Sequence, residues 1–213
     1  NSDPNVAAPN GFHFVLTDWQ IDNIVLPMRR LLQSRGESLY LSVRFVDFKE
    51  SAFEPNQNPA EYAELVLALF EHIRSKYGFV PDGFDVINEP DNSPGWRDPS
   101  MIGRLAATAG QRLARAGFQP DLTAPSTMNK GNAPSYFDGV MAQAGASQYV
   151  KELGWHCYAD SGQNSSAQIA ARGLAANVRT VQSECWTQGN NYQQLHDELK
   201  NSRNAVWGMG LIN

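Results

Sequence analysis

The alternation of strand-like and helix-like segments along the whole chain is the feature that most constrains its fold. Seven short runs rich in apolar residues predict strands at residues 12–18, 39–48, 84–88, 121–126, 152–158, 180–184 and 205–212. Several of these runs are almost continuously apolar, which is typical of parallel strands that helices cover on both faces. The pattern therefore predicts an α/β fold with a parallel sheet.

Two of the helices between these strands have clear start and stop signals. Residues 58–61, Asn-Pro-Ala-Glu, supply an N-cap, a proline in the first turn and the glutamate of a capping box, and Gly78 ends this helix. Asp98 begins the second helix and Gly117 ends it. Pro27 predicts either a kink or a later start in an earlier helix. Weaker helical patterns cover residues 21–35, 134–144, 165–176 and 192–202.

The length of the chain fits one domain that is shorter than a complete barrel. Its 213 residues, 42% of them hydrophobic, are enough for one sizeable core, whereas a complete eight-stranded α/β barrel has ~250 residues. Seven strands predict a TIM (β/α)8-type barrel, a single partial domain over residues 1–213, in which the first strand and the last helix are missing. Because unpaired barrel edges favour aggregation, we expect the chain to be an excerpt of a longer protein.

The charge and hydropathy of the chain restrict its partners. A formal net charge of −5 at pH 7 is unfavourable for binding a polyanion and suits a neutral substrate. No apolar stretch approaches the ~20 residues that span a membrane, and no signal peptide is visible. We therefore expect no nucleic acid partner, no membrane partner, no cofactor and no bound metal, and we expect a monomer.

The two cysteines, Cys157 and Cys185, lack the spacing of metal ligands. Each directly follows a residue that we place on the active face, so the period-two alternation of a strand directs both to the outer face of neighbouring strands. The preferred interpretation is a pair of buried free thiols against the helix layer. A disulfide bridge or a reactive thiol is the alternative.

Two glutamates carry the main indication of function. Glu89 closes the third predicted strand, within the sequence Asn88-Glu89-Pro90, and Glu184 closes the sixth. The carboxyl ends of barrel strands are where this architecture places its active site, so carboxylates three strands apart can face each other across one cleft. Glycoside hydrolysis needs such a pair, one carboxyl to protonate the leaving oxygen and another to attack or to activate water.

The sequence context assigns different roles to the two carboxylates. Glu89 is predicted to be the general acid/base, with a pKa raised by its surroundings and by the second carboxylate. Asn88 is predicted to hydrogen-bond a substrate hydroxyl beside the reacting carbon. Glu184 is predicted to be the nucleophile. Each glutamate could instead be an ordinary surface charge.

His156 and Tyr158 lie on the strand before the one that carries Glu184. Residues two apart in a strand share a face, so both side chains are predicted to point where Glu184 points. A phenol that donates to Glu184 would hold the carboxylate ionised and oriented. Arg44 and Asp47 either line the substrate cleft or form a structural ion pair.

Three tryptophans are candidate platforms for sugar rings, because flat aromatic faces pack on the apolar faces of pyranoses. They are Trp96, Trp186 and Trp207. Ordinary packing in the core or at its rim is the alternative for each.

Taken together, these residues resemble the glycoside hydrolases of clan A, retaining enzymes on an α/β barrel. The resemblance implies an acid/base glutamate in Asn-Glu-Pro after the fourth strand and a nucleophile after the seventh, which Glu89 and Glu184 match if one strand is missing upstream. His156, Tyr158 and residues 195–207 most resemble family 30, which includes glucosylceramidase-like and xylanase-like members. The run at 41–48 lacks that family's proline- and tryptophan-rich motif. The resemblance implies a retaining β-glycosidase, secreted or periplasmic, that acts on an oligo- or polysaccharide.

Two other functions remain open from the sequence. In a metal-dependent barrel enzyme, Glu89, Glu184, Asp47 and His156 would bind a divalent cation. In a non-catalytic or degenerate carbohydrate-binding barrel, the same cleft would hold a sugar without turnover.

Overall fold

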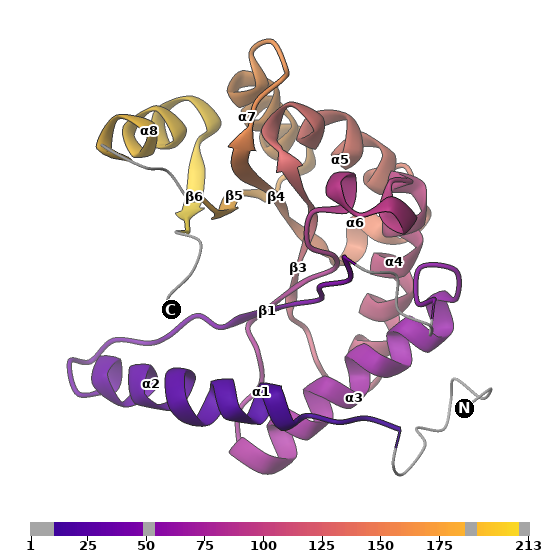
Figure 1. The fold of residues 1–213 in the computed structure, drawn as a ribbon, viewed down its shortest axis with the longest axis vertical. Helices are drawn as coiled ribbons and strands as arrows, with labels where there is room; N and C mark the ends of the chain where they lie inside the picture. The colour runs from indigo at the N-terminus through magenta and orange to yellow at the C-terminus, as the bar shows by residue number, and fades with distance from the viewer. Residues whose placement is uncertain (1–10, 49–53, 186–190, 209–213) are drawn as a thin grey trace.

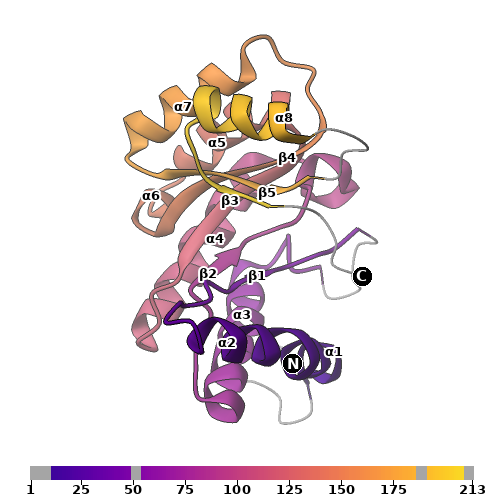
Figure 2. The same cartoon turned by 90° about the vertical axis from the view of Figure 1, so that its left-hand side faces the viewer.

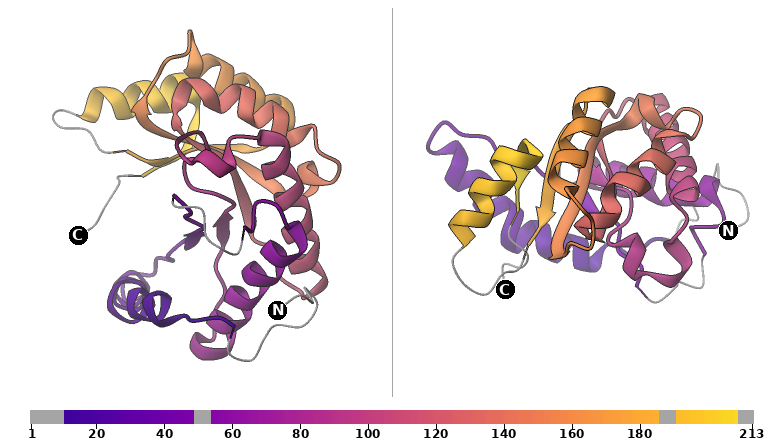
Figure 3. Two further views of the ribbon diagram at one scale, coloured as in Figure 1. Left: turned by 45° about the vertical axis from the view of Figure 1, so that its right-hand side comes forward. Right: turned by 90° about the horizontal axis from the view of Figure 1, so that it is seen from above.

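The computed structural model describes residues 11–48, 54–185 and 191–208. Within them, six strands form one parallel sheet in which each strand pairs with the next along the chain. The sheet curls into a half-barrel, with the strands inside the arc and helices outside it (Figure 1; Figure 3, left). The strands are β1 Ser42–Arg44, β2 Gly83–Asp85, β3 Asp121–Asn129, β4 Val150–Ala159, β5 Arg179–Glu184 and β6 Asn204–Trp207.

Helices connect successive strands and form the outer layer. Helices α1 and α2 lie at one end of the arc and α7 and α8 at the other (Figure 2). The α-helices are α1 Val15–Gln20, α2 Leu26–Gln33, α3 Pro59–Tyr77, α4 Pro99–Arg115, α5 Ala133–Met141, α6 Ala146–Tyr149, α7 Ser165–Ala176 and α8 Asn191–Asp197. Two π-helical segments, Ile21–Val25 and Glu198–Ser202, and three 3-10 turns, Pro90–Asn92, Pro94–Trp96 and Lys130–Asn132, complete the elements.

The capping signals correctly predict the two longest helices. The side chain of Asn58 accepts a hydrogen bond from the amide of Glu61, and Gly78 ends α3 in the left-handed conformation. The side chain of Asp98 accepts from the amide of Ser100 at the start of α4. These two helices bury their apolar stripes against the outer face of the sheet, where they supply much of the core.

The prediction of a strand at residues 12–18 is wrong. Helix α1 begins at Val15 and continues through Ile21–Val25 into α2. A short apolar run is compatible with either a strand or a helix, and here Val15 and Leu16 remain exposed. Pro27 lies in the first turn of α2, directly after the π-helical segment, a position at which the missing amide of proline is tolerated.

This correction changes the strand count but keeps the spacing of the two glutamates. The described residues contain six strands rather than the predicted seven. Glu89 follows the second strand and Glu184 closes the fifth, so they remain three strands apart. The predicted partial (β/α)8-type barrel with seven strands is therefore confirmed only as a curled parallel half-barrel of six described strands.

Charged side chains fill the interior of the half-barrel near the amino ends of the strands. Arg179 forms ion pairs with Asp121 and with the buried Glu152. Thr123 donates a hydrogen bond to the same Glu152 carboxylate, and Tyr40 also contacts it. These contacts satisfy a buried charge that would otherwise be costly in the barrel interior.

No helix in the described part of the chain is both long enough and apolar enough to cross a membrane.

Asp18 links α1 to α3 and generates a prediction about stability. Its carboxylate contacts His72, Lys76 and Tyr77. Burial raises the pKa of Asp18, but these contacts outweigh burial and lower the pKa to about 2. Asp18→Asn should therefore reduce the free energy of unfolding at pH 7 by about 1 kcal/mol or less, the range of partly exposed ion pairs.

The sign of this effect can be tested against pH. The ordinary pKa of an aspartate in an unfolded chain is ~3.9, so the contribution of Asp18 is complete above pH ~4 and is lost as the pH falls toward ~2. The free energies of unfolding of the native protein and of Asp18→Asn, measured with urea, should converge as the pH falls from ~4 to ~2. A difference that grows on acidification would contradict the assignment.

Candidate active site

Five of the residues singled out from the sequence meet at one pocket near the carboxyl ends of the strands. The pocket has a volume of about 530 Å³. The five residues are Arg44, Asn88, Glu89, Tyr158 and Glu184, and the apolar side chains of Val46, Phe48 and Met128 complete much of the lining. The five site residues come from β1, from the segment after β2, from β4 and from β5, which are far apart in sequence.

Glu89 is held by its backbone as well as by its side chain. It adopts φ 48°, in the left-handed region, where a non-glycine residue is uncommon, and its amide donates to the carbonyl of Ser126. The Oε1 atom lies 2.9 Å from Nδ1 of the fully buried His156, and the Nδ2 of Asn92 donates to Oε2 at 3.0 Å. A strained backbone at a buried carboxylate is characteristic of functional sites.

The pKa of Glu89 differs from the prediction. Burial raises the pKa of this carboxyl, but the hydrogen bonds with His156 and Asn92 outweigh burial and hold the pKa below its ordinary value. The prediction of a raised pKa for Glu89 was based only on burial and on the neighbouring carboxylate of Glu184. The sequence does not show that both carboxylate oxygens of Glu89 have hydrogen-bond partners in the folded protein.

Glu184 lies at the end of β5 with a partner on each carboxylate oxygen. The hydroxyl of Tyr158 donates to Oε1 at 2.7 Å, as the sequence predicted, and the guanidinium of Arg44 contacts Oε2. Burial, followed by the hydrogen bond to Glu184, raises the pKa of Tyr158, so this phenol stays protonated as a donor. The nucleophile candidate is thus oriented by one neutral and one cationic donor.

Arg44 connects three acidic or polar groups across the half-barrel. Besides Glu184, its guanidinium pairs with the buried Asp85 at 3.2 Å and donates to Oδ1 of Asn88 at 2.9 Å. Both alternatives raised for Arg44 therefore apply, since it lines the pocket and forms structural ion pairs. Asp47 does not line this pocket, and its carboxylate accepts from the indole of Trp96 at 3.1 Å.

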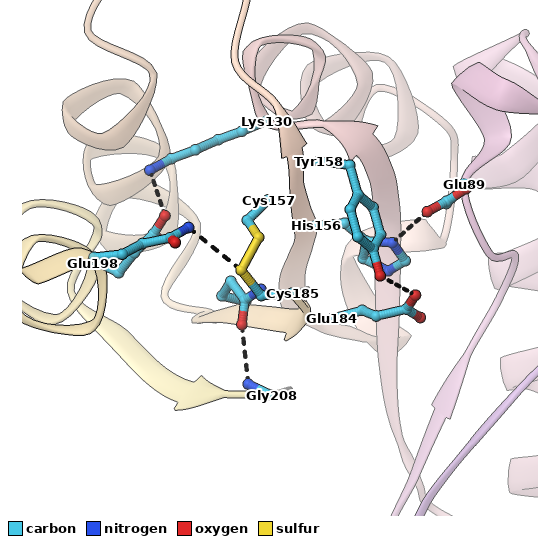
Figure 4. Close-up of a disulfide and its surroundings, with 11 residues drawn as sticks. Glu89, Lys130, His156, Cys157, Tyr158, Glu184, Cys185, Glu198 and Gly208 are labelled. Atoms are coloured by element: carbon cyan, nitrogen blue, oxygen red, sulfur yellow. Dashed lines mark hydrogen bonds and ion pairs between the residues drawn. A yellow bond between two sulfur atoms is a disulfide. The ribbon is translucent and has the colours of Figure 1, made fainter. Parts of the chain in front are cut away.

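The two glutamates and His156 form a compact cluster. One carboxylate oxygen from each glutamate and a ring nitrogen of His156 all lie within 4.8 Å of one another. Figure 4 shows the side chains of His156, Tyr158 and Glu184 on the side of the strands that faces Glu89. Such a cluster could bind a cation or perform carboxylate chemistry on a sugar.

The tryptophans are placed differently from the prediction. Trp96 is fully buried and hydrogen-bonded to Asp47 in the core, so it cannot stack on a sugar ring. Trp207 is half-buried at the end of β6 and does not line the pocket. Trp186 lies outside the described residues.

Sequence reasoning missed the aromatic residue that does line the pocket. Phe48 is 45% exposed there. Its signal was present in the sequence, because Arg44, Val46 and Phe48 alternate along one extended segment and therefore share a face. Asn92 and Met128 were also missed, since they come from loop and strand positions without a distinctive pattern.

The prediction of free thiols is wrong, because Cys157 and Cys185 form a disulfide. Their predicted direction is correct, since the bridge lies on the opposite side of the strands from Glu89 (Figure 4). His156 pairs with Glu184 across β4 and β5, and the next residue on each strand therefore comes side by side. The alternation within each strand predicts the face on which each cysteine lies, but not that Cys157 and Cys185 lie side by side.

Comparison with known proteins supports the same architecture. No protein-family model matches the chain. Over 80 residues, 37% of the chain, it is 36% identical to the endo-1,6-beta-D-glucanase neg1 of Aspergillus fumigatus, and the match covers 15% of that protein.

The solved structures that resemble the chain include glycoside hydrolases. The catalytic domain of GH30 xylanase C from Talaromyces cellulolyticus has a TM-score of 0.65 at 11% identity, over 99% of this chain and 54% of that one. A glucosidase from Croceicoccus marinus has a TM-score of 0.61 at 16% identity, over 100% of this chain and 48% of that one. The chain therefore spans about half the length of these structures. Its resemblance to the α/β-barrel glycoside hydrolases of clan A is confirmed at the level of the fold.

The environment of Glu89 leads to a prediction that does not depend on turnover. A carbon-13 NMR titration of the labelled glutamate carboxyls should give Glu89 a pKa below the ordinary ~4.3. His156→Ala should raise this pKa because it removes the largest lowering contact, and Asn92→Ala should raise it less. A titration of Glu89 above the ordinary range in the unmodified protein would contradict this account of the site.

Proposed function

We propose that this chain carries the catalytic site of a retaining β-glycoside hydrolase, with Glu184 as nucleophile and Glu89 as general acid/base. The proposal depends mainly on one observation, that carboxylate oxygens of these two residues lie within 4.8 Å of each other in one pocket. Retaining enzymes place their two carboxyl groups ~5–5.5 Å apart, whereas inverting enzymes leave ~6.5–9.5 Å for a water. The short separation favours the retaining mechanism.

In the first step, the carboxylate of Glu184 attacks the anomeric carbon of the bound sugar. The bond to the leaving oxygen breaks as the protonated Glu89 carboxyl gives that oxygen its proton. Tyr158 and Arg44 hold Glu184 during the approach. Because a bound sugar displaces water from the pocket, it increases the desolvation of Glu89 and favours the protonated acid.

In the second step, the ionised Glu89 acts as the base. It takes a proton from water as the water oxygen attacks the anomeric carbon, and the bond to Glu184 breaks. His156 contacts Oε1 of Glu89, so it fixes the orientation of the carboxyl group that transfers the proton. Two inversions at one carbon give a product with the original β-configuration.

The pocket suits a neutral carbohydrate. Asn88 accepts from Arg44 through Oδ1, which leaves its amide NH2 group to donate to a sugar hydroxyl next to the reacting carbon. Phe48 offers an exposed aromatic face in place of the tryptophans expected from the sequence. An oligo- or polysaccharide substrate fits this lining, and the local similarity to an endo-1,6-beta-D-glucanase makes β-glucans the first polymers to test.

A secreted or periplasmic location accords with this function. Disulfides persist mainly in oxidising compartments, and the chain contains one between Cys157 and Cys185. Polysaccharide substrates are usually found outside the cytoplasm, where such a bond would be retained.

A metal-dependent reaction is the second candidate, because Glu89, His156 and Glu184 cluster closely enough to hold a cation. The contacts of Glu184 count against it. Arg44 and Tyr158 already contact its two oxygens, and a guanidinium beside a bound divalent cation would be repelled. Dialysis against EDTA should therefore leave glycosidase activity unchanged, measured as initial rates on an aryl β-glycoside. Loss of activity that added cation restores would favour the metal reaction.

The roles of the glutamates can be separated by substitution. Glu184→Gln should abolish turnover of all glycosides, because no covalent intermediate can form. Glu89→Ala should retain glycosylation by substrates with an activated aryl leaving group, which needs little protonation. Deglycosylation without a base should be slow, and added azide should accelerate it and give a glycosyl azide of retained β-configuration.

The configuration of the azide product decides the assignment. An α-glycosyl azide from Glu89→Ala, identified by NMR of the anomeric proton, would mean that the roles are exchanged. Full activity of either variant would remove that residue from the mechanism. Sugar binding by the unmodified protein without turnover of any glycoside would favour the non-catalytic carbohydrate-binding barrel.

Tyr158→Phe tests the hydrogen bond to Glu184 separately. We expect kcat to fall by ~10–10³-fold, the scale of removing one preorganised hydrogen bond from a site. KM should change little, because the phenol contacts the nucleophile rather than the substrate. Asn92→Ala is a suitable comparison, since it removes a hydrogen bond from the other glutamate and should change the pH dependence more than kcat.

A further inference from the structure

The disulfide lies immediately beside three residues of the proposed active site. Cys157 stands between His156 and Tyr158 on β4, and Cys185 directly follows Glu184 on β5. The bridge therefore joins the strand that carries the two aromatic partners to the strand that carries the proposed nucleophile. Its Cα atoms are 5.0 Å apart.

The backbone pairing between β4 and β5 is irregular beside Glu184, where the bridge occurs. Trp155 pairs with Gln182, but the next residue, His156, pairs with Glu184, so Ser183 is an extra residue in β5. Such an irregularity re-aims the following side chain and interrupts the ladder. Glu184 therefore lies just beyond a break in its own pairing.

Among the described residues, the register between β5 and β6 does not extend to Glu184. The register between β5 and β6 ends with Gln182 opposite Trp207. The amide of Gly208 then donates to the carbonyl of Gln182, two residues before Glu184. In the described pairing, the backbone of Glu184 is thus supported from β4 alone.

We propose that the Cys157–Cys185 disulfide is a positioning element that holds Glu184 against Tyr158 and opposite Glu89, so that turnover depends on the oxidised state of this pair. The inference rests on the function proposed above. Neither cysteine lines the pocket, and the bridge lies on the opposite side of the strands from Glu89 (Figure 4), so it acts through the position of its neighbours.

The two cysteines of the bridge differ in their exposure to solvent. Cys185 is 2% exposed and accepts a hydrogen bond from the Nε2 of Gln194 on α8 at 3.4 Å, whereas Cys157 is partly exposed. A small thiol can therefore reach Cys157. Reduction by dithiothreitol transfers two electrons and two protons to the pair, giving two thiols and the cyclic disulfide of the reductant.

The first experiment uses the full-length protein and compares the oxidised form, the dithiothreitol-reduced form and Cys157→Ser/Cys185→Ser. Peptide mapping without reduction identifies the bond in each sample. Reduction and the double substitution should each lower kcat on an aryl β-glycoside by ~10²-fold, the scale expected of a displacement of about 1 Å in a catalytic group. KM should change less than threefold, and dithiothreitol should have no further effect on the variant.

A control variant distinguishes a loss of Glu184 positioning from a general loss of protein stability. Leu113 on α4 is fully buried and does not line the pocket, so Leu113→Ala should lower the melting temperature without lowering kcat. A loss of kcat in the disulfide-free protein, at a temperature where both variants are folded, supports positioning. Unchanged kcat in the disulfide-free protein, or an equal loss in Leu113→Ala, overturns it.

A double-mutant cycle tests the path of the effect. If the bridge acts through the contact between Tyr158 and Glu184, Tyr158→Phe should lower kcat much less in the disulfide-free protein than in the native one. Additive losses would mean that the bridge does not act through this hydrogen bond.

Hydrogen exchange provides a readout that does not need an active enzyme. The amides of residues 180–185 should exchange faster after reduction, by at least tenfold more than in Leu113→Ala. If the oxidised protein turns over no glycoside but shows this change, the proposed function fails and the positioning of Glu184 stands. Unchanged exchange overturns the positioning role whatever the activity.

Discussion

The ion pairs of Arg44 are the interaction on which the geometry of the pocket depends. Arg44 lies on β1 and contacts Asp85 on β2, Asn88 after β2 and Glu184 on β5. Neighbouring strands are already joined by backbone hydrogen bonds, but β1 and β5 are separated by three strands. The guanidinium therefore spans the inside of the arc and ties the two sides of the pocket together. The buried Asp85, which also accepts from Ser126 at 2.7 Å, keeps that cation in place.

The same arrangement gives two chemically identical carboxyls different environments. Glu184 meets a cation and a phenol, which orient it as a carboxylate, whereas Glu89 meets a ring nitrogen of His156 and an amide of Asn92. The hydrogen bonds with His156 and Asn92 hold the pKa of Glu89 below its ordinary value against the effect of burial, so the acid role proposed for Glu89 depends on further desolvation by a bound sugar. One partner of each glutamate comes from β4, because His156 and Tyr158 share one face of that strand but contact different glutamates.

Features that depend on local sequence patterns could be predicted from the sequence. Features that depend on contacts between distant residues could not. The two ends of helix α3 could be predicted because Asn58 and Gly78 each cap the helix turn next to them. The direction of the Tyr158 side chain followed from the period-two alternation of a strand. The helix at Val15 could not be distinguished from a strand by its apolar run alone. The burial of Trp96, the disulfide and the lowered pKa of Glu89 all depend on which distant residues come together. The sequence pattern carries no record of those distances.

Within the described residues, the side-chain partners of the two glutamates come from the arc of strands and from the turn after β2. Glu89 is held from β4 and from its own loop, and Glu184 from β4 and β1. None of these contacts needs a strand outside the arc. What the arc does need is fixed curvature, since a flatter sheet would separate β1 from β5 and break the contact between Arg44 and Glu184. The contacts of Arg44 with Asp85 and Glu184 and the curvature of the sheet therefore stabilise each other, and an uncharged residue at position 44 would weaken both.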